Sequence, residues 1–211
     1  MRILLLLTEV YSLKNLYKYH PNIHVLGNHG IGGKIHARIA PLATKIIDIV
    51  AYNNKDIRSE LLCSYESKSV LDLCCGVGYS TPTLTRNILN KGIDISKEMV
   101  NVGQTIFDDK NLIVADSETY RDKYNYDIVN ICFSLHEIPQ NARKIIIKNA
   151  INNARGKVCI MDICPSYYPS SSMLLGEPYL EDYLNNIEND LKRFNKNIII
   201  PNHVILWEYN I

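Results

Sequence analysis

The stretch Val70-Leu71-Asp72-Leu73-Cys74-Cys75-Gly76-Val77-Gly78-Tyr79-Ser80-Thr81 decides how the rest of this chain is interpreted. Its pattern predicts a short buried strand with an acidic residue, then a tight glycine turn and the start of a helix. Glycine lets the backbone approach a bound molecule closely, because no Cβ stands in the way. Strand, glycine turn and helix in this order are typical of a βαβ unit that holds a nucleotide-like cofactor.

A second acidic residue follows at the end of the next predicted strand. Eighteen residues after Gly76, the segment Lys91-Gly92-Ile93-Asp94-Ile95-Ser96 places Asp94 where a carboxylate can accept both hydroxyls of a ribose. The dinucleotide pattern Gly-x-Gly-x-x-Gly is incomplete, because Thr81 stands at the third glycine. Asp72 would also repel a pyrophosphate. It suits a positively charged ligand such as S-adenosylmethionine, which carries an ammonium and a sulfonium and no phosphate.

With these residues the chain resembles the class I S-adenosylmethionine-dependent methyltransferases over about residues 70–211. The family's acid-x-Gly-x-Gly-x-Gly motif maps onto this turn, with Cys74 in place of the commonest residue. The resemblance implies that S-adenosylmethionine is the cofactor, that Asp94 binds its ribose and that Asp116 lies on its adenine side. The implied cofactor site consists of Asp72, Cys74, Gly76, Gly78, Asp94, Ile95, Asp116, Ser117, Cys132 and Phe133.

The segment after the fourth predicted strand supplies the candidate catalytic residue. Ser134-Leu135-His136-Glu137-Ile138-Pro139 resembles the Leu-His-x-hydrophobic variant found mostly among family members that act on small molecules. His136 is our candidate for the catalytic base, because it lies at the carboxyl edge of the sheet and histidine titrates near neutral pH. The alternative is that His136 and Glu137 only brace the loop by hydrogen bonds.

From Ser69 onward, strand and helix patterns alternate, which predicts a parallel sheet with helices on both faces. The resemblance implies an α/β, Rossmann-like fold whose mostly parallel seven-stranded sheet is closed by a C-terminal antiparallel hairpin. We expect strands at 70–74, 91–95, 111–115, 126–132 and 157–163, and the hairpin at 198–209. The expected helices are 80–90, 97–107, 140–154 and 178–194.

The first 55 residues precede the first core strand. We expect an N-terminal helical cap and loop (1–55) and a cofactor-binding core (56–211), together forming one compact domain. Within the cap, a polar loop at 19–33 precedes a helix at 34–53, which Pro41 kinks or begins. The apolar side of that helix carries Ile35, Ile39, Leu42, Ile46, Ile47 and Val50. We expect the cap to cover the cofactor and acceptor; packing on the far face of the sheet is the alternative.

Two groups of side chains invite further readings. Four histidines do not predict a metal site, because Pro21 prevents a helical pair and no carboxylate or cysteine completes a ligand set; they are His20, His24, His29 and His36. A cluster of tyrosines follows the fifth strand, where the family often builds its acceptor pocket, and aromatic walls suit a planar acceptor. These are Tyr167, Tyr168, Tyr179 and Tyr183.

Composition narrows the class of function. The formal net charge is +1 and the chain has no basic stripe, so a nucleic-acid substrate is disfavoured. Six cysteines without a Cys-x-x-Cys pair, and an initial apolar run too short for a secretion signal, predict a reducing, cytoplasmic location. No stretch is long enough to span a bilayer.

We therefore expect methyl transfer from S-adenosylmethionine to a small organic acceptor, with oxygen or carbon favoured over nitrogen. One alternative is a methyltransferase that modifies RNA or protein. The other is a non-catalytic protein that binds the cofactor and serves as a partner or regulator. The oligomeric state stays open.

Overall fold

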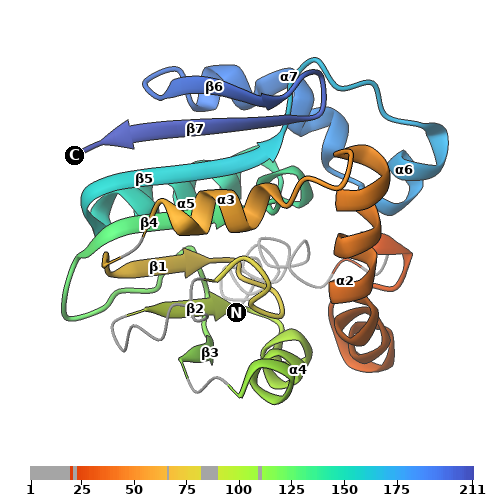
Figure 1. The fold of residues 1–211 in the computed structure, drawn as a ribbon, viewed down its shortest axis with the longest axis horizontal. Helices are drawn as coiled ribbons and strands as arrows, with labels where there is room; N and C mark the ends of the chain where they lie inside the picture. The colour runs from red at the N-terminus through yellow and green to blue at the C-terminus, as the bar shows by residue number, and fades with distance from the viewer. Residues whose placement is uncertain (1–19, 21–22, 66, 82–89, 109–110) are drawn as a thin grey trace, which may run out of the picture.

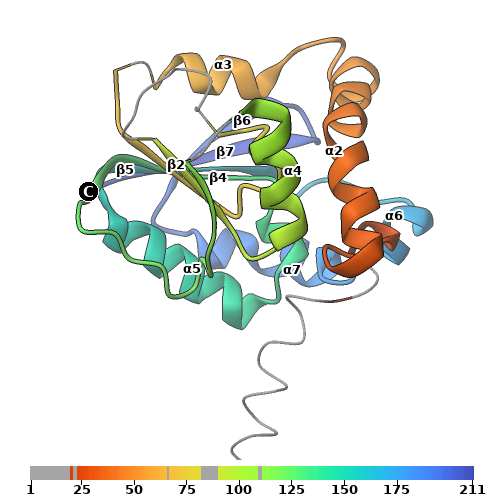
Figure 2. The ribbon, with the colours of Figure 1, turned by 90° about the horizontal axis from the view of Figure 1, so that it is seen from below.

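The computed structural model describes residues 20, 23–65, 67–81, 90–108 and 111–211. Its centre is a seven-stranded sheet with the strand order β3-β2-β1-β4-β5-β7-β6. Helices lie on both faces of this sheet (Figures 1 and 2). The expected Rossmann-like fold is confirmed, including the antiparallel hairpin at the C-terminal end of the sheet.

The strands follow the predicted order. They are β1 (Val70–Leu73), β2 (Lys91–Asp94), β3 (Leu112–Val114), β4 (Tyr126–Cys132), β5 (Ala154–Ile163), β6 (Asn195–Ile200) and β7 (Val204–Asn210). Strands β1 to β5 pair in parallel, and β7 runs antiparallel to both β5 and β6. All four residues of β1 are buried, as expected for a strand that helices cover on both faces. β5 and β6 each begin three residues earlier than predicted.

The α-helices are α2 (Gly30–Ala51), α3 (Ile57–Cys63), α4 (Lys97–Phe107), α5 (Gln140–Asn153), α6 (Ser171–Gly176) and α7 (Leu180–Asp190). Two short 3-10 helices, η2 (Ile23–Val25) and η4 (Leu135–Glu137), flank the site described below. Ser96 caps α4, because its hydroxyl accepts a hydrogen bond from the Met99 N–H at 3.2 Å. Most of the helix expected at 80–90 lies outside the described residues.

A buried arginine fixes the loop that follows β4. Helices α5 and α7 cover one face of the sheet, while α3 lies on the other (Figure 2). Arg143 of α5 is fully buried and donates to Asp190 at 3.0 Å and to the Ile138 carbonyl at 2.8 Å. A buried charge is tolerated only when it is paired and hydrogen-bonded. This network therefore ties α5 to α7 and to the segment that carries His136.

Helix α2 corrects two expectations. It begins at Gly30 and contains Pro41, so the last part of the expected loop at 19–33 is helical. Its large apolar side chains are exposed, from 45% for Ile39 to 81% for Ile31, within the described part of the chain. The helix docks instead through small residues, with Ala37 packed against Val77 and Met99. Small side chains allow α2 to approach its neighbours closely. Hydrophobic periodicity identifies only the side of the helix that carries large apolar side chains, so it did not predict this contact.

No helix among the described residues is long and apolar enough to cross a membrane.

Candidate functional site

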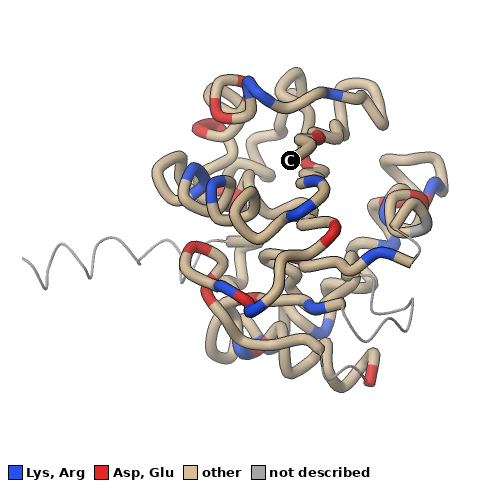
Figure 3. Tube along the Cα trace, turned by 90° about the vertical axis from the view of Figure 1, so that its left-hand side faces the viewer, with Lys and Arg blue, Asp and Glu red and all other residues tan. Residues whose placement is uncertain are grey.

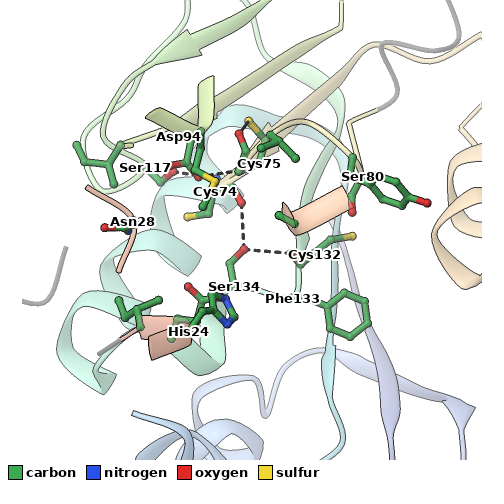
Figure 4. Close-up of a pocket in the computed structure, with 18 of the residues that line it drawn as sticks. His24, Asn28, Cys74, Cys75, Ser80, Asp94, Ser117, Cys132, Phe133 and Ser134 are labelled. Atoms are coloured by element: carbon green, nitrogen blue, oxygen red, sulfur yellow. Dashed lines mark hydrogen bonds and ion pairs between the residues drawn. The ribbon is translucent and has the colours of Figure 1, made fainter. Parts of the chain in front are cut away.

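The candidate site lies at the carboxyl edge of the parallel strands, where α2 stands beyond the end of β1 (Figure 1). A cavity of about 220 Å³ opens there. In Figure 4, Asp94 and Ser117 lie at one end of this cavity and His24 lies at the other. Open α/β sheets place their ligands at this edge, because the strand order reverses there.

The glycine turn has the backbone conformation that its sequence predicts. Gly76 (φ 55°) and Gly78 (φ 80°) are left-handed, and so is Cys74 (φ 59°). A Cβ at Gly78 would lie 2.8 Å from Leu112 Cδ1, so the turn packs closely on β3. A left-handed non-glycine residue costs on the order of 1–3 kcal/mol, and such strain clusters at ligand sites. Cys74 therefore marks a turn held in shape by its surroundings.

Asp94, the last residue of β2, is an acid that lines the cavity beside the turn. Its Oδ2 accepts the Gly76 N–H at 2.8 Å, and its Oδ1 accepts the Ser96 N–H at 2.8 Å. Each carboxylate oxygen has a second lone pair for a ligand hydroxyl. Burial raises the pKa of Asp94 to about 6, although the two N–H donors favour the ionised form. The group is therefore largely ionised at neutral pH.

Asp72 does not line the cavity, contrary to the expected contact with a cationic ligand. It is buried behind the turn, where the Thr81 hydroxyl donates to it at 2.7 Å and Asn130 Nδ2 at 2.9 Å. Burial raises the pKa of Asp72 to about 7, against the effect of these two donors. The residue that replaces the third glycine thus supplies a hydroxyl that holds Asp72 and the turn together.

Eight of the ten expected cofactor residues line the cavity, and only Asp72 and Gly78 do not: the eight are Cys74, Gly76, Asp94, Ile95, Asp116, Ser117, Cys132 and Phe133. Sequence reasoning missed Arg58 of α3, which also lines it. The Arg58 guanidinium lies 4.3 Å from the centre of the Phe133 ring and pairs with Asp48 of α2 at 2.9 Å. No local pattern marks Arg58, because its partners come from other elements.

His136 lies behind the cavity wall and is not a lining residue. Its Nδ1 lies 2.6 Å from Oδ1 of Asp162 on β5, a carboxylate that also accepts the Leu135 N–H at 2.8 Å. Burial alone would lower the pKa of His136, but Asp162 raises it to about 9. A protonated imidazole cannot accept a proton, so this geometry fits the bracing alternative better than the catalytic base.

The four tyrosines do not form the wall that we expected. None of them lines the cavity. Tyr183 is fully buried, and its hydroxyl donates to the Ile163 carbonyl at 2.7 Å, whereas Tyr168 is 93% exposed. Tyr167 packs its ring on His203 instead.

Polar residues from distant segments form the end of the cavity opposite Asp94. His24 Nε2 lies 2.9 Å from Glu137 Oε1, and His24 Nδ1 lies 2.8 Å from Glu177 Oε1. Burial would lower the pKa of His24, but Glu137 and Glu177 raise it well above its usual value. The His36 ring lies edge-on to His24 at 4.5 Å between centroids. The sequence analysis found no carboxylate to accompany these histidines, and for His24 this is wrong. The two glutamates were missed because they lie more than a hundred residues away along the chain.

The sheet order, the left-handed glycine turn and the strand-end acid define a Rossmann-like fold of the methyltransferase type. Residues 70–156 match the family model for a methyltransferase domain, which runs from β1 into β5. The chain therefore has the fold of the class I S-adenosylmethionine-dependent methyltransferases, and the matched region is less than half of its length. No curated protein shows significant sequence similarity to it.

Solved structures share the fold at low sequence identity. An S-adenosylmethionine-dependent methyltransferase from Clostridium acetobutylicum has a TM-score of 0.55 at 14% identity, over 82% of this chain and 98% of that one. Magnesium protoporphyrin IX methyltransferase from Synechocystis PCC 6803, with bound S-adenosylhomocysteine, has a TM-score of 0.52 at 17% identity, over 73% and 79%. The glycopeptide N-methyltransferase MtfA has a TM-score of 0.53 at 11% identity, over 73% and 88%.

Proposed function

We propose that this enzyme transfers a methyl group from S-adenosylmethionine to a small organic acceptor, with oxygen or carbon favoured over nitrogen. The observation that carries this proposal is Asp94, whose buried carboxylate is fixed by two backbone N–H groups and has lone pairs left toward the cavity. When bound, S-adenosylmethionine supplies an activated methyl group on a sulfonium. The chain's contribution is to bind, orient and exclude water.

The lining residues fit such a cofactor. Asp94 would accept the ribose hydroxyls, and the glycine turn would let the ligand approach the main chain at Cys74 and Gly76 closely. Asp116 and Ser117, at the end of β3, would flank the adenine. Cys132 and Phe133, at the end of β4, would contact the methionine part, and Arg58, which lines the same cavity beside Phe133, would pair with its carboxylate.

The described part of residues 1–55 supports the proposed cap. His24 precedes α2, and His36, Ala40 and Thr44 lie along it; all four line the cavity opposite the strand ends. Closure by such a segment would exclude water and strengthen every polar contact inside. In this scheme His136 is a positioning residue, because its hydrogen bond to Asp162 fixes the η4 segment that carries Glu137.

The acceptor is a small molecule in this proposal, since the cavity is about 220 Å³ and residues of α2 and of the strand ends line it from two sides. A methyltransferase acting on RNA or protein is the alternative. An RNA substrate calls for a basic surface, whereas basic and acidic residues are interspersed over the described chain (Figure 3). We also place the enzyme in the cytoplasm, because the cysteines at 74, 75, 132, 159 and 164 are all free thiols.

Two measurements test the proposal. Calorimetric titration should show binding of S-adenosylmethionine and S-adenosylhomocysteine and none of nicotinamide dinucleotides. Turnover of radiolabelled S-adenosylmethionine should then label a fraction of a metabolite pool rather than RNA or protein. Binding of a dinucleotide without any response to S-adenosylhomocysteine would overturn the cofactor assignment. Label appearing only in RNA or protein would overturn the acceptor class.

A further inference from the structure

Three side chains at the acceptor end of the cavity form a compact group of metal-ligating atoms. His24 comes from η2, Glu137 from η4, and Glu177 from the residue after α6. The imidazole lies between the two carboxylates, at 2.9 Å from Glu137 and 2.8 Å from Glu177. One ligand atom from each of the three residues can be chosen so that all lie within 4.8 Å of one another.

The group contains a buried oxygen that nothing in the described chain satisfies. Glu177 is only 7% exposed, and its Oε2 has no hydrogen-bond partner. Leaving a buried charged acceptor unpaired costs roughly 1–3 kcal/mol or more. Ion pairs of Glu137 and Glu177 within the described residues are all with histidines. The histidine contacts explain one oxygen of Glu177 and leave the other without a role.

The spacing suits a single bound cation. Ligand atoms about 2.1 Å from one ion in a tetrahedral site lie about 3.4 Å apart. Side-chain shifts of about an ångström would therefore close the observed group around an ion. His24 and Glu137 line the cavity, so the remaining coordination position of such an ion faces the space where an acceptor would bind.

We propose that His24, Glu137 and Glu177 bind a divalent first-row transition metal ion, with an open position toward the acceptor. One imidazole nitrogen and two carboxylate oxygens suit Mn²⁺, Fe²⁺ or Zn²⁺, whereas Mg²⁺ prefers oxygen ligands and keeps its waters. The inference deepens the proposed function and rests on it for its role. The ion would hold an oxygen-bearing acceptor and favour its unprotonated form.

The test uses the full-length protein and Mn²⁺ as the main probe, because the free thiols would compete for Zn²⁺. Electron paramagnetic resonance titration should show one tightly bound Mn²⁺ per chain, displaced by Zn²⁺ and not by an equal concentration of Mg²⁺. Glu177→Gln and His24→Ala should each weaken Mn²⁺ binding by more than about 100-fold. Loss of a residue that only supports a metal ligand weakens binding by about 10- to 100-fold, so a larger effect indicates a direct ligand. Circular dichroism checks that each variant is folded.

A matched control comes from a second histidine–carboxylate pair. His29 Nδ1 lies 3.5 Å from Glu98 Oε2, and no third metal-ligating side chain joins them among the described residues, so His29→Ala should leave Mn²⁺ binding unchanged. Should Glu177→Gln fail to fold, Glu137→Gln replaces it. The proposal is overturned if wild type binds no Mn²⁺, or if folded Glu177→Gln and Glu137→Gln bind it as tightly as wild type.

A separate titration with S-adenosylhomocysteine keeps the two proposals apart. Glu177 does not line the cavity, so Glu177→Gln should bind S-adenosylhomocysteine as wild type does. Wild type that binds Mn²⁺ without binding S-adenosylhomocysteine would refute the proposed function and leave the metal site standing. The reverse result would refute the metal site alone.

Discussion

Replacing Asp94 with asparagine separates ligand binding from folding. Asparagine has the same shape but only one acceptor oxygen, so either the Gly76 or the Ser96 N–H loses its acceptor. That loss costs about 1–3 kcal/mol. The rise of the Asp94 pKa from 3.8 to about 6 means that burying the carboxylate lowers the free energy of unfolding by about 3 kcal/mol at neutral pH. Asparagine is uncharged and does not have this cost. These effects oppose, so the free energy of unfolding should stay within about 2 kcal/mol of wild type.

Cofactor affinity has no such compensation. One hydrogen bond from a ribose hydroxyl to a charged acceptor is lost, at about 1.5–3 kcal/mol, which weakens S-adenosylhomocysteine binding about 10- to 200-fold. Wild-type affinity should also fall as the pH drops through about 6, because protonation removes the carboxylate, and Asp94→Asn should show no such dependence. Calorimetry at several pH values and urea unfolding measure both quantities. An unchanged dissociation constant in the folded variant would refute the ribose assignment.

The matched control is Asp127→Asn. Asp127 also accepts a backbone N–H, from Ser69 at 2.9 Å, but it lies outside the cavity lining. This variant should leave the affinity for S-adenosylhomocysteine unchanged, whatever its effect on stability.

Three further predictions concern the core, the turn and the cap. Arg143→Ala should lower the free energy of unfolding by about 3 kcal/mol, because the buried Asp190 loses its buried cationic partner and keeps only Lys144 at 3.5 Å and the Gln140 amide at 2.9 Å. Arg155→Ala at an exposed pair should have a much smaller effect, and equal effects in urea unfolding would contradict this account. Folding raises the pKa of Asp72 from 3.8 to about 7, so its contribution to stability is lost as pH rises through that window. The free energy of unfolding of Asp72→Asn, relative to that of wild type, should therefore rise by up to about 4 kcal/mol from acid to neutral pH. Stability curves of the two proteins that run parallel over this pH range would contradict the prediction. A chain that begins at Asp56 should bind S-adenosylhomocysteine more weakly and lose methyl transfer, and intact turnover would disprove the cap.

Local patterns predicted the end of the cavity at the glycine turn, and long-range contacts decided the end at His24. The turn at Gly76 and the strand-end position of Asp94 follow from residues close together in sequence, where glycine conformation and strand periodicity leave few choices. His24 and Glu177 meet only because η2 and the segment after α6 fold over the same sheet edge. No spacing rule in the sequence connects them.

His136 shows that residue type alone does not fix the protonation state of a side chain. Its place after β4 was predictable, but its protonation is set by Asp162 on the neighbouring strand. Helix α2 gives a second case. The periodicity of its isoleucines indicated an apolar side, whereas the described contacts are made by Ala37 and other small residues.

Ser96 contacts both ends of the site. Its N–H donates to Asp94, and its hydroxyl donates to the carbonyl of Asn28, in the loop between His24 and α2. We expect a movement of Asp94 on binding a ribose to displace this loop through Ser96. The consequence is kinetic: the enzyme should add its two substrates in a fixed order, methyl donor first, and release S-adenosylhomocysteine last. Product inhibition by S-adenosylhomocysteine would then be competitive with the donor and noncompetitive with the acceptor.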